Sequence, residues 1–248
     1  MTKGIFITAT GTDVGKTYIS ALILKKMKEL SLNCGYYKPA MSGIEEGKLC
    51  DAEYVFKIAG LEGNPMDFVS YPFVEALSPH LASKRAGVSI ELNKIKDDFD
   101  RIKTNYNYVL VEGAGGIICP FNMDEGKEIL LPDVIKALGL DIIIVADAKL
   151  GTINSTVLTV EYARQKGINI QGIILNNYDG NDFMQVDNKE KIEKLTGIKV
   201  ISTVKKDEKD IKLRCHSEAE SYGILRSAQN DVIAEESHII TSIFKEIK

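Results

Sequence analysis

Thr8-Ala-Thr-Gly-Thr-Asp-Val-Gly-Lys-Thr17 is the stretch of this chain that decides its fold. An apolar run, residues 5–7, precedes it, and residues 18–23, with apolar side chains at helical spacing, follow it. The stretch therefore lies where a strand turns into a helix. Helix N-termini bind phosphate groups, because their first backbone N–H groups are free and the dipole end is positive.

The residues within this stretch are those that a phosphate-binding loop needs. Gly15 lets the backbone approach a phosphate, Lys16 reaches the β- and γ-phosphates, and the Thr17 hydroxyl can bind Mg²⁺. The usual motif has a further glycine where this chain has Thr10, and the nearest glycine is Gly11. A chance Gly-Lys-Thr at a helix start is the alternative, which the preceding strand disfavours. The stretch predicts a nucleoside triphosphate site.

Composition is that of an ordinary globular protein. The 248 residues are 44% hydrophobic and 27% charged, and we expect one α/β domain over residues 1–248. The net charge of −4 and the lack of a basic block predict no nucleic-acid partner. We expect no secretion signal, because the first apolar run is short, and no membrane span, because no apolar run reaches roughly 18 residues.

The cysteines indicate the compartment. No two of them form a C-x-x-C pair, which argues against a zinc site and against a disulfide framework. This spacing is typical of a protein in the reducing cytoplasm, where we expect the chain to be. The cysteines are Cys34, Cys50, Cys119 and Cys215.

Short apolar runs alternate with longer amphipathic segments. Residues 142–145 are apolar without interruption, which is typical of a parallel strand buried on both faces. The alternation predicts an α/β, P-loop NTPase-like fold: a mostly parallel sheet with helices on both faces, and ligands beyond the carboxyl ends of the strands. The predicted strands are 5–8, 35–38, 109–112, 142–146, 172–175 and 200–203.

The last part of the chain has a different pattern. Residues 205–235 contain a charge run and little apolar periodicity, which predicts a surface loop. Helical spacing then returns and predicts a docking helix at the end of the chain. Its apolar residues are Ile239, Ile240, Ile243, Phe244 and Ile247.

Polar residues stand at the ends of the predicted strands. Lys38 ends the second strand and could contact an anion, with a solvated lysine as the alternative. Asp51 opens a helix, where ordinary capping is the alternative to a role in a site. Glu112 ends the third strand before the glycine-rich residues 113–116, where a carboxylate can bind Mg²⁺ or its waters. A purely structural acid is disfavoured there, because a buried charge would lack a partner.

Two further strand ends carry candidate contacts. Residues 149–154 lead into a helix whose free N–H groups could hold a carboxylate, or Asn154 could simply cap the helix. Asn176 and Asn177 follow the fifth strand. Their amides donate and accept hydrogen bonds and suit a purine edge, with a turn as the alternative.

Six segments in this order resemble dethiobiotin synthetase, and the resemblance covers about residues 3–204. One such motif is weak evidence, whereas six in order are specific. The segments are Thr10-Gly11-Thr12-Asp13-Val14-Gly15-Lys16-Thr17, Tyr37-Lys38-Pro39 with Ser42-Gly43, Ser78-Pro79-His80, Val111-Glu112-Gly113-Ala114-Gly115-Gly116, Lys149-Leu150-Gly151-Thr152-Ile153-Asn154, and Asn176.

The resemblance implies a homodimeric enzyme that needs Mg²⁺ and uses ATP as a co-substrate. Such an enzyme joins 7,8-diaminononanoate and CO₂ into the cyclic urea dethiobiotin and releases ADP and phosphate. The implied course is a carbamate, then a carbamoyl-phosphate mixed anhydride, then ring closure by the second amine. The protein would mainly position groups and stabilise charge.

The resemblance also implies residue roles. The Mg²⁺ ligands would be Thr17, Asp51 and Glu112, and the catalytic ammonium groups would be those of Lys16 and Lys38. The nucleotide would contact Gly11, Thr12, Asp13, Val14, Gly15, Lys16, Thr17 and Asn176, the last reading adenine. The substrate would contact Thr12, Lys38, Ser42 and Gly115, with Gly151, Thr152, Ile153 and Asn154 of the partner subunit at its distal carboxylate.

The chain departs from the family pattern in three places. Asp13 stands where family members often have Glu. Residues 201–205 lack the family's Gly-x-x-Pro-like turn beside adenine, which leaves base contacts there unassigned. Residues from about 214 to 232 have no counterpart and are interpreted as an inserted loop before the last helix.

Two other functions match parts of the sequence. Partitioning and cell-division-positioning ATPases share this fold and often end in a membrane-binding helix. Their loop carries a signature lysine five residues before the catalytic one, where this chain has Gly11. The synthetase half of a cobyrinate-type amidotransferase needs a glutaminase domain, for which 248 residues leave no room.

Overall fold

A parallel β-sheet forms the centre of the molecule. The structure, a computed structural model, describes residues 2–213 and 229–247. The sheet has eight strands in the order β3-β2-β4-β1-β7-β8-β9, with β10 paired to β1. All pairs from β3 to β9 are parallel and β10 is antiparallel, so the predicted sheet type is confirmed. The strands are β1 (Lys3–Ala9), β2 (Cys34–Met41), β3 (Val69–Pro72), β4 (Tyr108–Glu112), β7 (Ile142–Asp147), β8 (Ile170–Asn176), β9 (Val200–Val204) and β10 (Lys245–Glu246).

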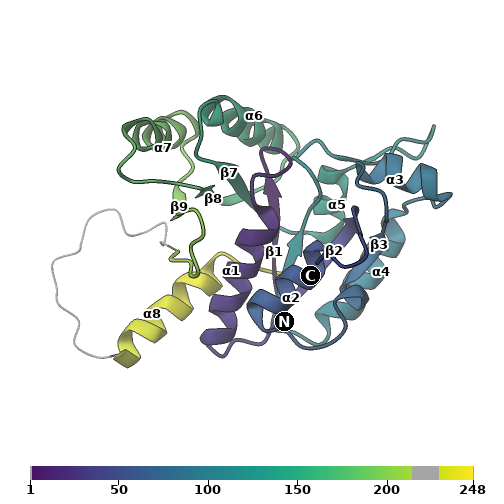
Figure 1. Cartoon of the computed structure of the whole chain (residues 1–248), viewed down its shortest axis with the longest axis horizontal. Coiled ribbons are helices and arrows are strands. Elements are labelled where there is room, and N and C mark those ends of the chain that lie inside the picture. The colour runs from purple at the N-terminus through teal and green to yellow at the C-terminus, as the bar shows by residue number, and fades with distance from the viewer. Residues whose placement is uncertain (1, 214–228, 248) are drawn as a thin grey trace.

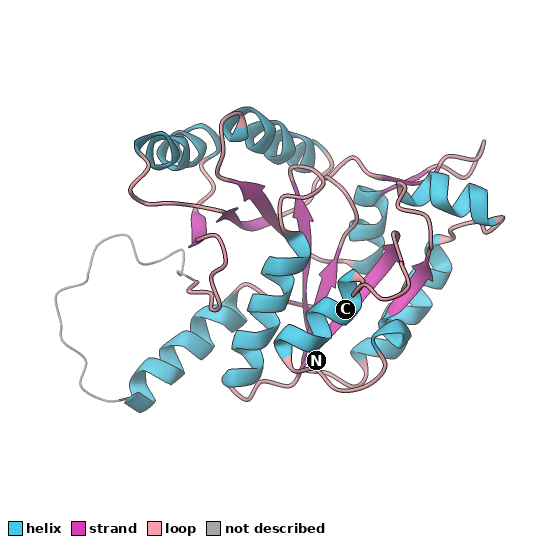
Figure 2. Ribbon diagram, viewed as in Figure 1, coloured by secondary structure: helices cyan, strands magenta, loops and turns pink. Residues whose placement is uncertain are grey.

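Helices cover both faces of this sheet, as Figures 1 and 2 show. One layer consists of α1 (Lys16–Glu29), α2 (Asp51–Ala59) and α8 (Gln229–Ser242). The other consists of α3 (Pro79–Ala86), α4 (Leu92–Lys103), α5 (Leu131–Leu138), α6 (Thr152–Gln165) and α7 (Phe183–Thr196). A short 3₁₀ helix, η1 (Pro65–Phe68), and a separate hairpin, β5 (Pro120–Asn122) with β6 (Ile129–Leu130), complete the elements.

The central strands are buried on both sides. In β1, Ile5 and Ile7 pack against the layer of α1, α2 and α8, whereas Phe6 packs into the opposite layer. Successive side chains of a strand point to opposite faces, so only a run without polar residues can fill both cores. This requirement explains why the uninterrupted apolar runs predicted these strands correctly.

Strand register brings the site residues to one edge of the sheet. Ile7 of β1 pairs with Glu112 of β4, and Tyr37 of β2 pairs with Val111. Lys38 is the next residue of β2 and Glu112 is the next residue of β4, so the two lie side by side at the same level of the sheet. Because the carboxyl ends of parallel strands meet at one edge, the phosphate-binding loop after β1 lies at the same place.

The prediction for the end of the chain is wrong in part. Helix α8 ends at Ser242, and β10 then pairs with Lys3 and Gly4 of β1 instead of continuing the helix. Ile243, Phe244 and Ile247 are nevertheless buried, as a docking segment requires. The predicted surface loop is also wrong at its end, because α8 already begins at Gln229. Residues 214–228 of the predicted insertion lie outside the described residues.

Within the described ranges, no helix has the length and apolar character needed to cross a bilayer.

Candidate functional site

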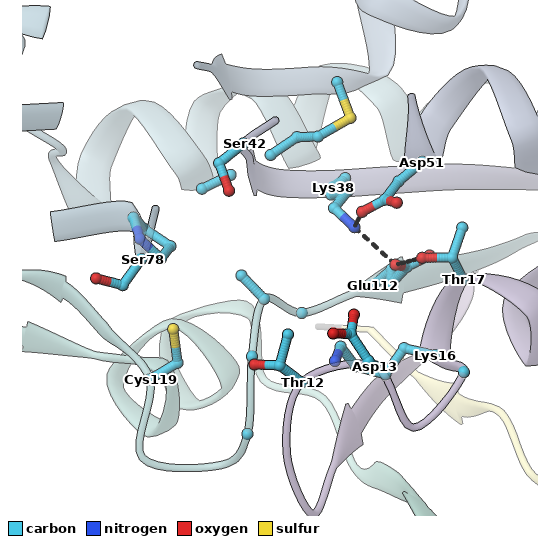
Figure 3. A pocket seen from close by; sticks show the side chains of 18 of the residues that line it. Thr12, Asp13, Lys16, Thr17, Lys38, Ser42, Asp51, Ser78, Glu112 and Cys119 are labelled. Carbon is cyan, nitrogen blue, oxygen red and sulfur yellow. Dashed lines mark hydrogen bonds and ion pairs between the residues drawn. The ribbon is translucent and has the colours of Figure 1, made fainter. Parts of the chain in front are cut away.

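A cavity of about 1330 Å³ lies at the carboxyl edge of the sheet. Figure 3 shows the phosphate-binding loop on one side of it and the residues that follow β2 on the other. The predicted site residues that line it are Thr12, Asp13, Gly15, Lys16, Thr17, Lys38, Ser42, Asp51, Glu112, Gly115 and Asn154. The predicted residues that are not part of its lining are Gly11, Val14, Gly151, Thr152, Ile153 and Asn176.

The phosphate-binding loop turns through two left-handed residues, Asp13 (φ 59°) and Gly15 (φ 97°). A Cβ added to Gly15 would lie 2.2 Å from Asn176 Nδ2, so this position needs glycine for space as well as for conformation. Asn176 Nδ2 donates to the Val14 carbonyl at 3.1 Å, and the Asn176 side chain is buried under the loop. The amide expected to read adenine thus holds the loop in this structure.

Lys16 is the first residue of α1 and is 8% exposed. Its Nζ donates to the Gly11 carbonyl at 3.2 Å. Burial lowers the pKa of the Lys16 ammonium from its usual value, although the nearby Glu112 charge opposes this shift. The ammonium group therefore lies among the loop's own backbone, where a phosphate would be held.

Four side chains from four elements meet beside the loop. Lys38 Nζ lies 2.6 Å from Glu112 Oε1 and 2.5 Å from Asp51 Oδ2. Thr17 Oγ1 donates to the same Glu112 Oε1 at 2.7 Å. Alternation along β2 and β4 points Lys38 and Glu112 to the face covered by α1 and α2, whose first turns supply Thr17 and Asp51. Dashed lines in Figure 3 mark the contacts of this cluster.

Opposite charges shift the pKa values of Lys38 and Asp51. Burial alone would lower the pKa of Lys38, but the Glu112 and Asp51 carboxylates raise it above the usual value. Burial likewise tends to raise the pKa of Asp51, and the Lys38 ammonium overrides this and lowers it. Lys38 is therefore a charged group inside the protein, held by two carboxylates.

The structure decides between alternatives that the sequence leaves open. Lys38 is 3% exposed and is not a solvated lysine. The N-cap of α2 is Cys50 and that of α6 is Gly151, so neither Asp51 nor Asn154 acts as the cap. Glu112 at the end of β4 was expected to lack a partner if it were purely structural, and this is wrong, because the Lys38 ammonium pairs with it.

The oxygen donors of this cluster fit Mg²⁺. The Thr17 hydroxyl and the carboxylates of Asp51 and Glu112 are hard oxygen ligands that converge within hydrogen-bonding distance of one another or of one ammonium group. The described residues contain no group of three or more His, Cys, Asp or Glu side chains suited to a metal. A magnesium ion here would therefore take further ligands from phosphate oxygens and water.

The first turn of α6 contributes fewer residues to the cavity than the sequence predicts. Thr152 is buried, and its Oγ1 faces Thr156 Oγ1 at 3.4 Å, so its side chain is turned away from a ligand. Asn154 lines the cavity of its own chain, together with Leu158 from the next turn. Gly151 begins the helix with φ 92°.

Sequence reasoning gave no role to three residues that the structure places at the site. Tyr36 OH donates to Glu112 Oε2 at 3.0 Å; its position two residues before Lys38, on the same strand face, was an available signal. Ser78 lines the cavity and belongs to a quoted segment without a predicted role. Cys119 follows the glycine-rich loop and also lines the cavity, and burial raises the pKa of its thiol to about 11.

Known proteins resemble this chain over most of its length. A family model described as an AAA domain matches residues 3–210. An ATP-dependent dethiobiotin synthetase of Clostridium botulinum (strain 657) is 55% identical over 193 residues, which cover 76% of this chain and 85% of that protein. The chain belongs to the dethiobiotin synthetase family. The synthetase of the Loch Maree strain is 50% identical over 209 residues, 83% of this chain and 92% of its own length.

Solved structures of other proteins have a fold similar to that of this chain. The septum site-determining protein MinD of Pyrococcus horikoshii, complexed with Mg-ADP, matches with a TM-score of 0.50 at 16% identity, covering 84% of this chain and 82% of MinD. A ParA family ATPase of Chlorobium tepidum matches with a TM-score of 0.50 at 14% identity, covering 98% and 90%. These likenesses confirm the P-loop fold alone.

Proposed function

We propose that this protein is an ATP-dependent dethiobiotin synthetase, which joins 7,8-diaminononanoate and CO₂ into dethiobiotin and releases ADP and phosphate. The observation that carries the proposal is the buried ammonium of Lys38, which enters the cavity beside the phosphate-binding loop in addition to Lys16. The cavity, at about 1330 Å³, exceeds the range of roughly 300–1,000 Å³ typical of single-ligand sites. It has room for a nucleotide and a second small molecule.

The chemistry uses these residues mainly to position reactants and stabilise charge. One substrate amine captures CO₂ as a carbamate, whose oxygen attacks the γ-phosphorus of ATP. ADP leaves, and a carbamoyl-phosphate mixed anhydride forms. The second amine then attacks the anhydride carbon, closes the ring and expels phosphate. Lys16 and Lys38 stabilise the charge on the transferring phosphoryl group and on the carbamate.

The remaining proposed contacts follow from this course. The backbone of residues 11–16 holds the phosphates, and Thr12, Ser42 and Gly115 contact the substrate near its reacting end. Asn176 reads adenine through Oδ1, which has no hydrogen-bond partner among the described residues, whereas its Nδ2 bonds Val14. Thr17, Asp51 and Glu112 would hold Mg²⁺, which would neutralise charge on phosphate oxygens.

We also propose a homodimer in the cytoplasm, with Gly151, Thr152, Ile153 and Asn154 of one subunit at the substrate's distal carboxylate in the other. Leu150, Leu158 and Ile118 support a protein contact near the cavity, since they are 80%, 61% and 56% exposed. Cys34, Cys50 and Cys119, the cysteines that the structure describes, are free and buried, which supports a reducing compartment.

The direct test measures product and phosphate together. Purified protein with Mg-ATP, bicarbonate and 7,8-diaminononanoate should release one phosphate for each dethiobiotin detected by mass spectrometry, and little phosphate without the diamine. Lys38→Gln should lower the rate roughly 10²- to 10⁴-fold, because transition-state charge loses its partner. Lys191→Gln on α7, whose side chain is 45% exposed, is the matched control and should behave like wild type.

ATP hydrolysis that ignores the diamine would contradict the proposal and favour a switch ATPase. Near-normal turnover by Lys38→Gln would remove Lys38 from the mechanism.

A further inference from the structure

Tyr36 is a buried tyrosine behind the cluster in which Lys38 pairs with Asp51 and Glu112. The proposed chemistry assigns it no role. Its side chain has no exposed surface, and its hydroxyl donates to Glu112 Oε2 at 3.0 Å. The ring packs edge-to-face on Phe56 of α2, with ring centroids 6.3 Å apart at an interplanar angle of 82°. Tyr36 is therefore fixed between β2 and α2, and its hydroxyl is fixed with it.

The two oxygens of Glu112 have different partners. Oε2 accepts from Tyr36, whereas Oε1 accepts from both Thr17 Oγ1 at 2.7 Å and Lys38 Nζ at 2.6 Å. A terminal carboxylate rotates easily about its last torsion. The phenol removes this freedom, because rotation would leave a buried carboxylate oxygen without its donor. One oxygen of Glu112 thus stays directed at the cavity.

We propose that Tyr36 is a positioning residue that sets the metal affinity of the site. It holds Glu112 with Oε1 directed toward Thr17 and toward the magnesium ion that the site would bind. The inference rests on the magnesium part of the proposed function and adds to it a residue outside the ligand set. Hydrogen-bond partners of metal ligands orient those ligands, and removing one typically weakens metal binding or activity roughly 10- to 100-fold. Tyr36 is in the position of such a partner.

The adjacent residue offers a matched control. Tyr37 is also fully buried, but it points into the opposite layer, where its hydroxyl contacts Ser70 Oγ at 2.6 Å and donates to the Ile95 carbonyl at 2.9 Å. Tyr36→Phe and Tyr37→Phe each remove one phenol oxygen from a buried ring of β2. Both variants lose hydrogen bonds that stabilise the fold, but only Tyr36→Phe removes a hydrogen bond to Glu112.

The test measures Mn²⁺, a paramagnetic ion that prefers the same oxygen ligands as Mg²⁺, bound to the full chain in the presence of ADP. Electron paramagnetic resonance gives the Kd for Mn²⁺. We expect Tyr36→Phe to raise this Kd roughly 10- to 100-fold and Tyr37→Phe to change it less than about 2-fold. Equal Kd values for the two variants would overturn the inference.

A double variant tests whether Tyr36 acts through Glu112. Glu112→Gln removes the buried charge, and Tyr36→Phe added to it should leave the Mn²⁺ Kd where Glu112→Gln alone puts it. A further weakening of about 10-fold would mean that Tyr36 does not act through Glu112. Wild-type protein that binds no Mn²⁺ with ADP would overturn the magnesium assignment and this inference together. If the wild-type protein binds Mn²⁺ and makes dethiobiotin, equal Mn²⁺ Kd values for Tyr36→Phe and Tyr37→Phe overturn the role of Tyr36 alone.

Discussion

Replacing Lys38 by Met tests the ion pair on which the site is built. Glu112 has no exposed surface and Lys38 is 3% exposed, with their charged atoms 2.6 Å apart. Removing the ammonium leaves a buried carboxylate without this cation, which typically costs about 3–5 kcal/mol of unfolding free energy. For a chain of this size the melting temperature should fall by about 6–20 °C.

The structure also predicts an asymmetry between the two partners. Glu112→Gln leaves Lys38 paired with Asp51 at 2.5 Å, so its cost should be smaller, about 1.5–3 kcal/mol. The double variant Lys38→Met/Glu112→Gln contains neither buried charge. It should regain at least about 2 kcal/mol relative to Lys38→Met alone.

Urea denaturation followed by circular dichroism, in EDTA and without nucleotide, measures these free energies. Lys103→Met is the control, since its ion pair with Asp100 has the same 2.6 Å separation but Asp100 is 56% exposed. It should cost no more than about 1 kcal/mol. A Lys38→Met loss below about 1 kcal/mol, or a double variant no more stable than Lys38→Met, would refute the reasoning.

Two other predictions concern the nucleotide loop and the subunit contact. Gly15→Ala should weaken ATP binding at least about 10-fold in calorimetry, because the added methyl group would lie 2.2 Å from Asn176 Nδ2. Gly139→Ala is the control and should leave the ATP affinity unchanged, because Gly139 also has a positive φ, 68°, but no atom lies within 4 Å of the added Cβ. Equal affinities would count against the loop contact. Inactive Lys16→Gln chains and inactive Asn154→Asp chains should regain activity when they are mixed, because one of the two sites in the heterodimer then has both normal residues. Native mass spectrometry confirms that heterodimers form. No recovery of activity, or a monomer at assay concentration, would argue for a site built within one chain.

The fold could be predicted from the sequence wherever burial on two faces left a continuous apolar run. Residues 142–146 are the clearest case. Strand β3 at the sheet edge and the hairpin of β5 and β6 were missed, because 4, 3 and 2 residues are too few for a hydrophobic pattern to be recognised. At the end of the chain, Ile243, Phe244 and Ile247 match helical spacing, yet Lys245 and Glu246 between them pair with β1 as a strand.

Many residues that line the cavity were predictable from the sequence, but the contacts between them were not. Strand ends identified Lys38 and Glu112 because polar residues follow apolar runs there. Their direct pairing depends on β2 lying beside β4, and the order of strands in a sheet is not written in local sequence. The same limit applies to Asn176, whose amide nitrogen bonds Val14 only because β8 ends beneath the loop.

The position of β1 has a consequence for the order of folding. It is the first strand along the chain, yet it lies inside the sheet between β4 and β7. Its pairs Lys3–Tyr108 and Phe6–Ile142 each join residues more than 100 positions apart, and such distant closures are slow. The loop that receives ATP is therefore flanked on both sides only in the late stages of folding. We expect chains that stall earlier to bind no nucleotide, and bound ATP to stabilise only molecules whose sheet is complete.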